Sequence, residues 1–131
     1  SATSYPMLRR DAIACERYNR LHPDQPPQEP YVRQVLARTK GPIVATSDYM
    51  RTLPEQVAPY LDGRLLALGT DGFGRSETRT ALRRFFEVDA EHVAVAALTA
   101  LANRGELGRD VVKQAIADLG LNPNAPDPWT V

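Results

Sequence analysis

The segment LGTDGFGRSETR (68–79) has the residue types of a loop that binds phosphate. It follows the apolar run RLLALG and precedes a stretch that looks helical. Glycines let a backbone approach an anion closely, and Arg75 with the free N–H groups of a helix beginning after Ser76 could hold one. The residues of this candidate anion-binding loop are Asp71, Gly72, Phe73, Gly74, Arg75 and Ser76.

Neither of the common phosphate motifs matches this loop. A dinucleotide fingerprint needs a third glycine where the sequence has Glu77, and a P-loop needs lysine where it has Arg75, at a spacing that also differs. The simpler interpretation is that the glycines permit a sharp turn and that Ser76 caps the following helix. This interpretation predicts a helix over ETRTALRRFFE (77–87).

The other groups that could do chemistry lack partners along the sequence. Thr70-Asp71-Gly72 and Asn103 only partly match the motif of a thiamine diphosphate site, because the first glycine is displaced and the stretch between them looks helical. His22 and His92 have no second ligand at a metal-binding spacing, and no G-x-S-x-G marks a serine nucleophile. We therefore predict no catalytic, cofactor-binding or metal-binding residue in these 131 residues.

Composition restricts the class of protein. The length of 131 residues suits one domain, spanning 1–131. Sixteen basic residues balance sixteen acidic ones, which gives no electrostatic reason to expect nucleic acid or an anionic membrane surface as a partner. No apolar run reaches the roughly 18 residues of a membrane span. The single Cys15 cannot form an internal disulfide, which suits a reducing, cytoplasmic compartment.

Apolar periodicity predicts alternating strands and helices. Strands are expected at SATSY (1–5), IVATS (43–47) and RLLALG (64–69). Helices are expected at 7–21 after Pro6, at 31–38, in short pieces between 48 and 62, at 77–87, at 90–104 between Asp89 and Gly105, and at 108–120. The proline-rich HPDQPPQEP (22–30) suits an ordered surface crossing or a flexible linker, and the tail LNPNAPDPWTV should be extended. The pattern is typical of an α/β domain with mostly parallel strands.

Residues 91–102 form the most apolar predicted helix, with almost no polar face. A helix that is apolar all round is buried on more than one side. One side can rest on the sheet. The helix at 108–120 or a neighbouring domain or subunit could cover the other, and the sequence leaves both alternatives open.

Several segments together resemble a known family. They are CERYNRLHP, PYVRQVL, ATSDYMRTLPEQVAPYL, LGTDGFGRSETRTALRRFFEVDAEHVAVAAL and RGELGRDVVKQAIADLGLN. They are similar to the C-terminal end of the homodimeric bacterial pyruvate dehydrogenases, which belong to the transketolase-like superfamily. The resemblance covers essentially the whole chain.

The resemblance implies a three-layer α/β/α domain with a mixed, mostly parallel sheet. It also implies a non-catalytic, dimer-supporting role in an oxidoreductase that decarboxylates pyruvate and passes the acetyl group to the lipoyl group of an acetyltransferase component. Thiamine diphosphate and magnesium would be bound by other domains of that enzyme. The loop at 71–76 would then face another domain. A small-anion or nucleotide-binding module using residues 69–76 is the alternative.

The resemblance further implies that SATSY is preceded by strands of the same domain, so that about three strands of a larger mixed sheet remain. The fragment alone is then expected to be inactive. Its partners would be the remaining domains of the same enzyme, the second subunit and the acetyltransferase. Because strand edges would be left unpaired, we expect self-association in which residues 1–5 or the helix at 91–102 approach the interface.

Overall fold

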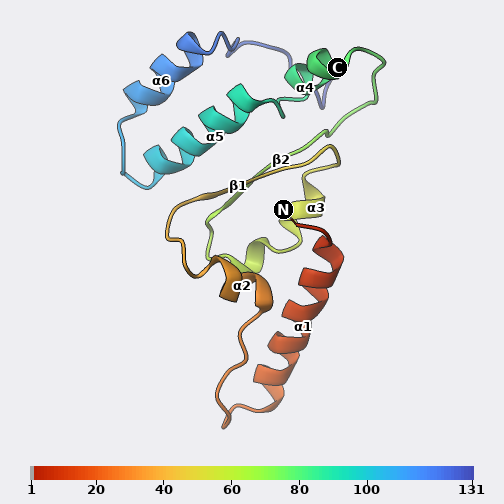
Figure 1. Ribbon diagram of the computed structural model, residues 1–131, viewed down its shortest axis with the longest axis vertical. Helices are drawn as coiled ribbons and strands as arrows, with labels where there is room; N and C mark the ends of the chain where they lie inside the picture. The colour runs from red at the N-terminus through yellow and green to blue at the C-terminus, as the bar shows by residue number, and fades with distance from the viewer. Residues whose placement is uncertain (1) are drawn as a thin grey trace. The chain divides into compact units, whose positions relative to one another are not determined.

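The computed structural model describes residues 2–131, which form two compact units. Unit 1 comprises the residues up to Gly41 together with Thr52–Leu65, and unit 2 comprises Pro42–Arg51 and Leu66–Val131. The elements are α1 (Tyr5–Leu21), α2 (Tyr31–Leu36), β1 (Ile43–Thr46), α3 (Thr52–Glu55), the 3₁₀ turn η1 (Ala58–Tyr60), β2 (Leu65–Leu68), α4 (Arg79–Phe85), α5 (Ala90–Asn103) and α6 (Arg109–Asp118) (Figure 1). None of these helices is long and apolar enough to cross a membrane.

The strand predicted at residues 1–5 is wrong: residues 2–4 form no strand, and helix α1 begins at Tyr5. Ser4 is the N-cap: its hydroxyl accepts a hydrogen bond from the N–H of Met7, and Pro6 lies in the first turn. A hydroxyl cap followed by proline is a helix start, and it outweighs the strand preference of the short stretch before it. Ser1 lies outside the described residues.

Unit 1 is built around contacts between α1 and the chain that returns along it. The proline-rich crossing is ordered rather than a loose linker, because the Asn19 amide donates to the carbonyl oxygen of Gln28 at 2.9 Å and accepts from its N–H at 2.7 Å. The carboxylate of Asp11 accepts the N–H of Tyr31 at 2.7 Å, at the first residue of α2. Ala12 and Cys15 of α1 and Val32 of α2 are buried.

Unit 2 contains a small parallel sheet in which β1 pairs with β2. The predicted α/β class and the two strands IVAT and LLAL are confirmed, but the described residues contain two strands rather than three. No residue of either strand is fully buried. The sheet therefore keeps apolar surface exposed, which is unusual for parallel strands.

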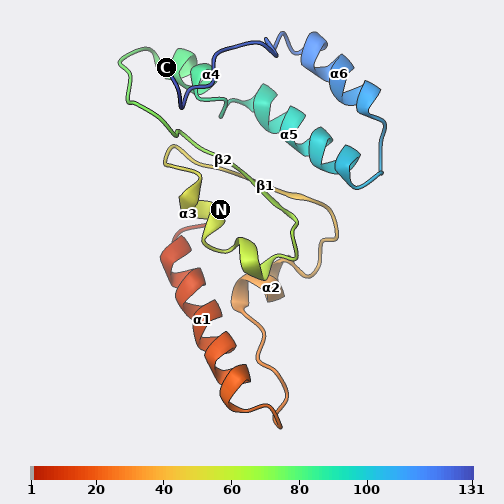
Figure 2. The same cartoon turned by 180° about the vertical axis from the view of Figure 1, so that it is seen from behind.

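The apolar helix α5 packs on β1, and α6 packs on α5 (Figure 1, Figure 2). Asp89 caps α5 and Gly105, at φ +75°, ends it, both as predicted. Within unit 2, helix α6 is thus the second element that covers α5, which is one of the two alternatives that the sequence leaves open. The cover is incomplete, because Ala96 is the one residue of α5 that is buried.

The tail after α6 is not simply extended, as the sequence suggested. Turns form where Ala125 donates to the carbonyl oxygen of Asn122 at 3.1 Å and where Thr130 donates to that of Asp127 at 2.9 Å. Asn122 and Asp127 also accept N–H groups two residues on, which is the usual Asx turn. The prolines of this segment restrict its backbone but do not exclude such turns.

The predicted cap Ser76 is wrong as well. Helix α4 begins two residues later, with Thr78 as its N-cap, and the Thr78 hydroxyl accepts the N–H of Ala81 at 3.3 Å. The half-buried apolar side chains here are Leu82 and Phe85 of α4 and Phe86, its C-cap, so one helical turn separates Thr78 from the first apolar position that is covered. Ser76 is exposed in the segment before the cap.

We therefore expect Thr78→Ala to lower the free energy of unfolding by about 1 kcal/mol, because the first turn of α4 loses its hydroxyl acceptor. Ser76→Ala is the matched control, since it removes a hydroxyl two residues away that caps nothing. It should change stability by less than about 0.5 kcal/mol. Urea denaturation of both variants measures the difference, and a larger loss for Ser76→Ala would contradict the assignment of the cap.

Candidate functional site

The loops that follow β1 and β2 are joined by backbone and side-chain hydrogen bonds. The N–H of Ser47 donates to the carbonyl oxygen of Leu68 at 3.1 Å, and the N–H of Thr70 donates to that of Tyr49 at 2.9 Å. The Thr70 hydroxyl donates to the carbonyl oxygen of Asp48 at 2.8 Å. The pairing of the two strands is thus continued beyond their carboxyl ends, the edge at which α/β proteins place their ligand sites.

An ion pair closes the same junction. The Oδ2 atom of Asp71 accepts the Nε–H of Arg51 at 3.0 Å and the backbone N–H of Arg51 at 3.2 Å. Asp71 is only 8% exposed, whereas the side chain of Arg51 is 50% exposed. Of the predicted loop residues, Asp71 is therefore one whose role is internal: it ties the second loop to the first.

Two glycines of this junction are required by close packing rather than by a ligand. A Cβ atom on Gly69 would lie 2.6 Å from the carbonyl oxygen of Tyr49 and from the N atom of Arg51. Gly72 has φ +107°, and a Cβ atom there would lie 2.4 Å from the carbonyl oxygen of Pro128 in the C-terminal tail. The glycine pattern that suggested phosphate thus lets three backbone segments meet.

The rest of the predicted loop is exposed and does not converge on a common point. Phe73, Gly74 and Ser76 are exposed, with Phe73 at 78%. The guanidinium of Arg75 lies 4.2 Å from the centre of the Phe85 ring, in a cation–π contact. The structure therefore separates Asp71 and Gly72, which contact other segments of unit 2, from Phe73, Gly74 and Ser76, which make no such contact and are exposed.

A cleft of about 280 Å³ opens beside the packed half of the loop. Its lining includes Arg51, Asp71, Phe86, Glu87, Asp127 and Trp129. Three of these side chains are carboxylates, and the arginine is already paired with one of them. Such a lining repels a phosphate group, so the cleft gives no support for anion binding.

Large apolar side chains surround this junction without cover. Tyr49 and Met50 follow β1, Phe73 follows β2 and Trp129 lies in the tail, with exposures of 72%, 57%, 78% and 59%. Aromatic residues and methionine are enriched at protein interfaces. We name these four residues the aromatic rim. The rim gives the loops a surface suited to binding another protein segment.

His22 and Cys15, which could do chemistry elsewhere, make contacts within the fold here. The ring of His22 stacks on Tyr18 at 4.3 Å. Burial, with the nearby carboxylate of Asp11, raises the pKa of the Cys15 thiol, so this thiol stays protonated near neutral pH. Within residues 2–131 no group of three histidine, cysteine or acidic side chains could hold a metal ion.

Asp89 is more heavily bonded than His22 or Cys15. Its Oδ1 accepts the backbone N–H of His92 at 3.0 Å, and its Oδ2 lies 2.9 Å from Nε of Arg84. Partial burial by itself would raise the pKa of Asp89. Hydrogen bonds from His92, and the charges of His92 and Arg84, outweigh burial and hold the pKa below its usual value.

This pKa predicts how stability depends on pH. The folded pKa of Asp89 lies below the unfolded value of about 3.9, so the contribution is complete above about pH 4 and is lost as pH falls through the folded pKa. Asp89→Asn keeps a good cap but removes the charge, so it should cost about 1 kcal/mol at pH 7. The difference in stability between the variant and the wild type should therefore shrink as the pH is lowered through the folded pKa. Urea denaturation at pH 7 and at a series of lower pH values measures this, and a difference that does not change with pH would contradict it.

Sequence reasoning missed the partners of the loop. Arg51 lies twenty residues before Asp71, and Pro128 lies more than fifty residues after Gly72, so no local pattern links them. The signal that was present is the pair Gly69 and Gly72 on either side of Thr70-Asp71, directly after an apolar strand. Such spacing indicates backbone crowding as readily as a ligand.

Comparison with known proteins identifies the family. A family model described as "Transketolase-like TK C-terminal domain" matches residues 1–89. The chain is also similar to proteins named "Pyruvate dehydrogenase E1 component". It is 48% identical over 128 residues to that of Cupriavidus necator, 47% over 129 residues to that of Pseudomonas aeruginosa, and 48% over 131 residues to that of Escherichia coli K12.

Each of these matches covers 98% of the chain but only 14% or 15% of the relative. The chain thus spans about one seventh of the length of the curated relatives that it matches. The α/β fold, the parallel strands and the family match agree with one another, and the predicted resemblance is confirmed. The chain belongs to the transketolase-like C-terminal domain family and is homologous to the C-terminal region of bacterial pyruvate dehydrogenase E1 components.

Proposed function

We propose that this chain is a non-catalytic, dimer-supporting structural domain of a homodimeric pyruvate dehydrogenase. The enzyme would decarboxylate pyruvate oxidatively with thiamine diphosphate and magnesium held by its other domains, and would transfer the acetyl group to the lipoyl group of an acetyltransferase component. Identity of 48% across 98% of the chain is the observation that carries this proposal. The bacterial relatives and the single cysteine favour the bacterial cytoplasm as its compartment.

The loop junction supports a structural role for residues 69–76. Two of its polar residues hold the junction together: Asp71 bonds to Arg51, and Thr70 bonds to Asp48 and Tyr49. What it presents outward is the aromatic rim, which suits packing against protein. The loop at 71–76 is therefore best assigned to contact with another domain or with the second subunit.

A chimera tests the proposal directly. Residues 1–131 would replace the matched segment of the Escherichia coli protein, to which they are 48% identical. We expect the chimera to remain dimeric by light scattering, to decarboxylate pyruvate with an artificial electron acceptor, and to reduce NAD when mixed with the other components of the complex. A folded chimera that is monomeric and inactive would overturn the assignment.

The isolated chain should not bind the cofactor. The loop has no phosphate motif, and the cleft beside it carries three carboxylates. Calorimetric titration with thiamine diphosphate and magnesium is expected to show no saturable heat, with the full-length Escherichia coli protein as the positive control. Micromolar binding by the isolated chain would contradict the prediction.

A small-anion or nucleotide-binding module remains the second candidate, on the strength of Arg75 and the glycines alone. Its weakness is that Arg75 stacks on Phe85 and that Ser76 does not cap the helix. Inorganic phosphate or ATP should then leave the melting temperature of the chain unchanged. A concentration-dependent rise that Arg75→Gln abolishes would favour this candidate over the structural role.

A further inference from the structure

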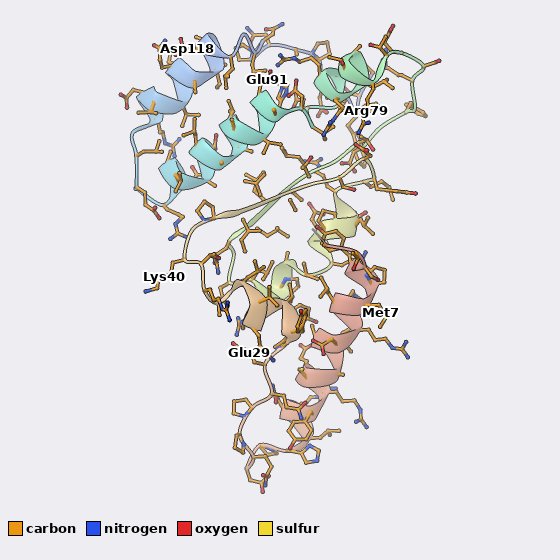
Figure 3. All side chains as sticks on the ribbon, in the orientation of Figure 1. Met7, Glu29, Lys40, Arg79, Glu91 and Asp118 are labelled. Carbon is orange, nitrogen blue, oxygen red and sulfur yellow. The ribbon has the colours of Figure 1, made fainter. Side chains whose placement is uncertain are left out.

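The outward face of α1 carries a regular pattern of its own. Met7, Arg10, Ala14, Arg17 and Leu21 follow one another at alternating spacings of three and four, so they lie in one row along the helix. All five are exposed, with Met7 at 60% and Leu21 at 54%. Figure 3 shows Met7 on the side of α1 away from α2. We call this row the α1 seam.

The rest of α1 explains why the seam faces outward. Ala12 and Cys15 are buried on the opposite side. The acidic side chains of the helix are used within unit 1: Asp11 accepts the N–H of Tyr31 at 2.7 Å, and Glu16 accepts the hydroxyl of Tyr60 at 3.4 Å. No carboxylate of α1 therefore belongs to the seam.

The seam is consequently a cationic surface with apolar positions between the charges. Arg10 and Arg17 lie within it, and Arg9 and Arg20 flank it on one side. None of the four makes an ion pair with any residue from 2 to 131. Arginine and methionine are also the residue types that are enriched at protein interfaces.

We propose that the α1 seam binds an acidic α-helix, whose apolar side chains meet Met7, Ala14 and Leu21 and whose carboxylates meet Arg10 and Arg17. The alternating spacing of three and four is the one by which two helices keep a common line of contact. A partner with the complementary charge gains its specificity from the two arginines. This binding does not require that the chain be part of a pyruvate dehydrogenase, because every residue that supports it lies in unit 1 of this chain.

The pattern of charged and apolar residues on the seam favours an acidic helix over a membrane surface or a second copy of α1. On a membrane-surface helix the apolar face is uninterrupted by charge, whereas here Arg10 and Arg17 alternate with the apolar positions along the seam. A second copy of α1 would bring four more arginines against the first four, with no carboxylate on either seam. An acidic helix satisfies both the charges and the apolar positions.

Two synthetic peptides test the proposal. One is a fluorescent 21-residue helix whose seam alternates Leu and Glu at about the same spacings of three and four, and the other has Lys in place of Glu. Fluorescence anisotropy at physiological salt should show that the chain binds the Glu peptide and not the Lys peptide. The double variant Arg10→Glu/Arg17→Glu should bind the Glu peptide about tenfold or more weakly than the wild type, and it should bind the Lys peptide.

Arg38→Glu/Lys40→Glu is the matched control, because it changes the net charge equally at exposed residues that follow α2. It should alter the affinity for the Glu peptide by less than about twofold, since neither residue belongs to the seam and exposed charges are screened by salt. Circular dichroism would verify that both double variants stay folded. Equal binding of both peptides, an equal loss in the control, or binding to phosphatidylserine vesicles without binding to the Glu peptide would each overturn the proposal.

Discussion

Replacing Gly72 by alanine is expected to lower the free energy of unfolding by about 3 kcal/mol. The residue has φ +107°, which an L side chain adopts only with strain, and its Cβ would lie 2.4 Å from the Pro128 carbonyl oxygen. We expect the strain and the steric clash both to contribute to this loss. The tail at 128–129 must move, and Trp129 is the only tryptophan of the chain. Its fluorescence therefore reports the displacement directly.

Substitutions of two other glycines distinguish backbone strain from the steric clash. Gly74 has nothing within 4 Å of a built Cβ and no positive φ, so Gly74→Ala should leave both stability and Trp129 fluorescence unchanged. Gly63 has φ +72° and open space, so Gly63→Ala should cost about 1 kcal/mol through strain alone. If Gly72→Ala costs no more than Gly63→Ala, the tail does not pack against the loop as described.

The sequence predicted the elements whose signals are local. Helix α5 has its cap at Asp89 and its stop at Gly105 within one continuous apolar segment, and both were located correctly. Strands β1 and β2 are short apolar runs that each follow a glycine within two residues, and these too were placed within one residue at each end. In each case the residues that define the element also lie inside it or beside it.

The errors arose where two local signals competed. At the start of the chain, short β-branched and hydroxyl residues favoured a strand, but Ser4 and Pro6 form a helix start. Before α4, Ser76 and Thr78 are both acceptable caps, and the apolar positions from Leu82 onward decide in favour of Thr78. Propensity alone cannot rank such alternatives, because the choice depends on which side chains become covered.

The candidate site was the least predictable part, because its contacts are long-range. The glycine loop was located by its residue types, yet its packing depends on Tyr49 and Arg51 of the loop after β1 and on Pro128 of the C-terminal tail, which are two separate segments. A sequence pattern can indicate that a backbone turns sharply at Gly72. It cannot indicate whether a ligand or another backbone occupies the space that the glycine leaves.

The ion pair between Arg51 and Asp71, in which only the carboxylate is buried, is expected to give the second large effect on stability. Arg51→Met should lower the free energy of unfolding by about 3 kcal/mol, because it leaves the carboxylate of Asp71, which is 8% exposed, without its cationic partner. Asp71→Asn should cost less, about 1 to 2 kcal/mol, because the half-exposed Arg51 side chain can turn to water and the amide oxygen can still accept the N–H of Arg51.

The two changes together should cost less than their sum, because the charge left unpaired by Arg51→Met no longer exists when residue 71 is asparagine. Urea denaturation of the two single variants and the double variant forms the cycle. Arg104→Met is the matched control: it breaks the pair with Glu106, whose side chains are 39% and 47% exposed, and should cost less than about 0.5 kcal/mol. Strict additivity, or an Arg51→Met variant as stable as the Arg104→Met control, would mean that this ion pair does not hold the two loops together.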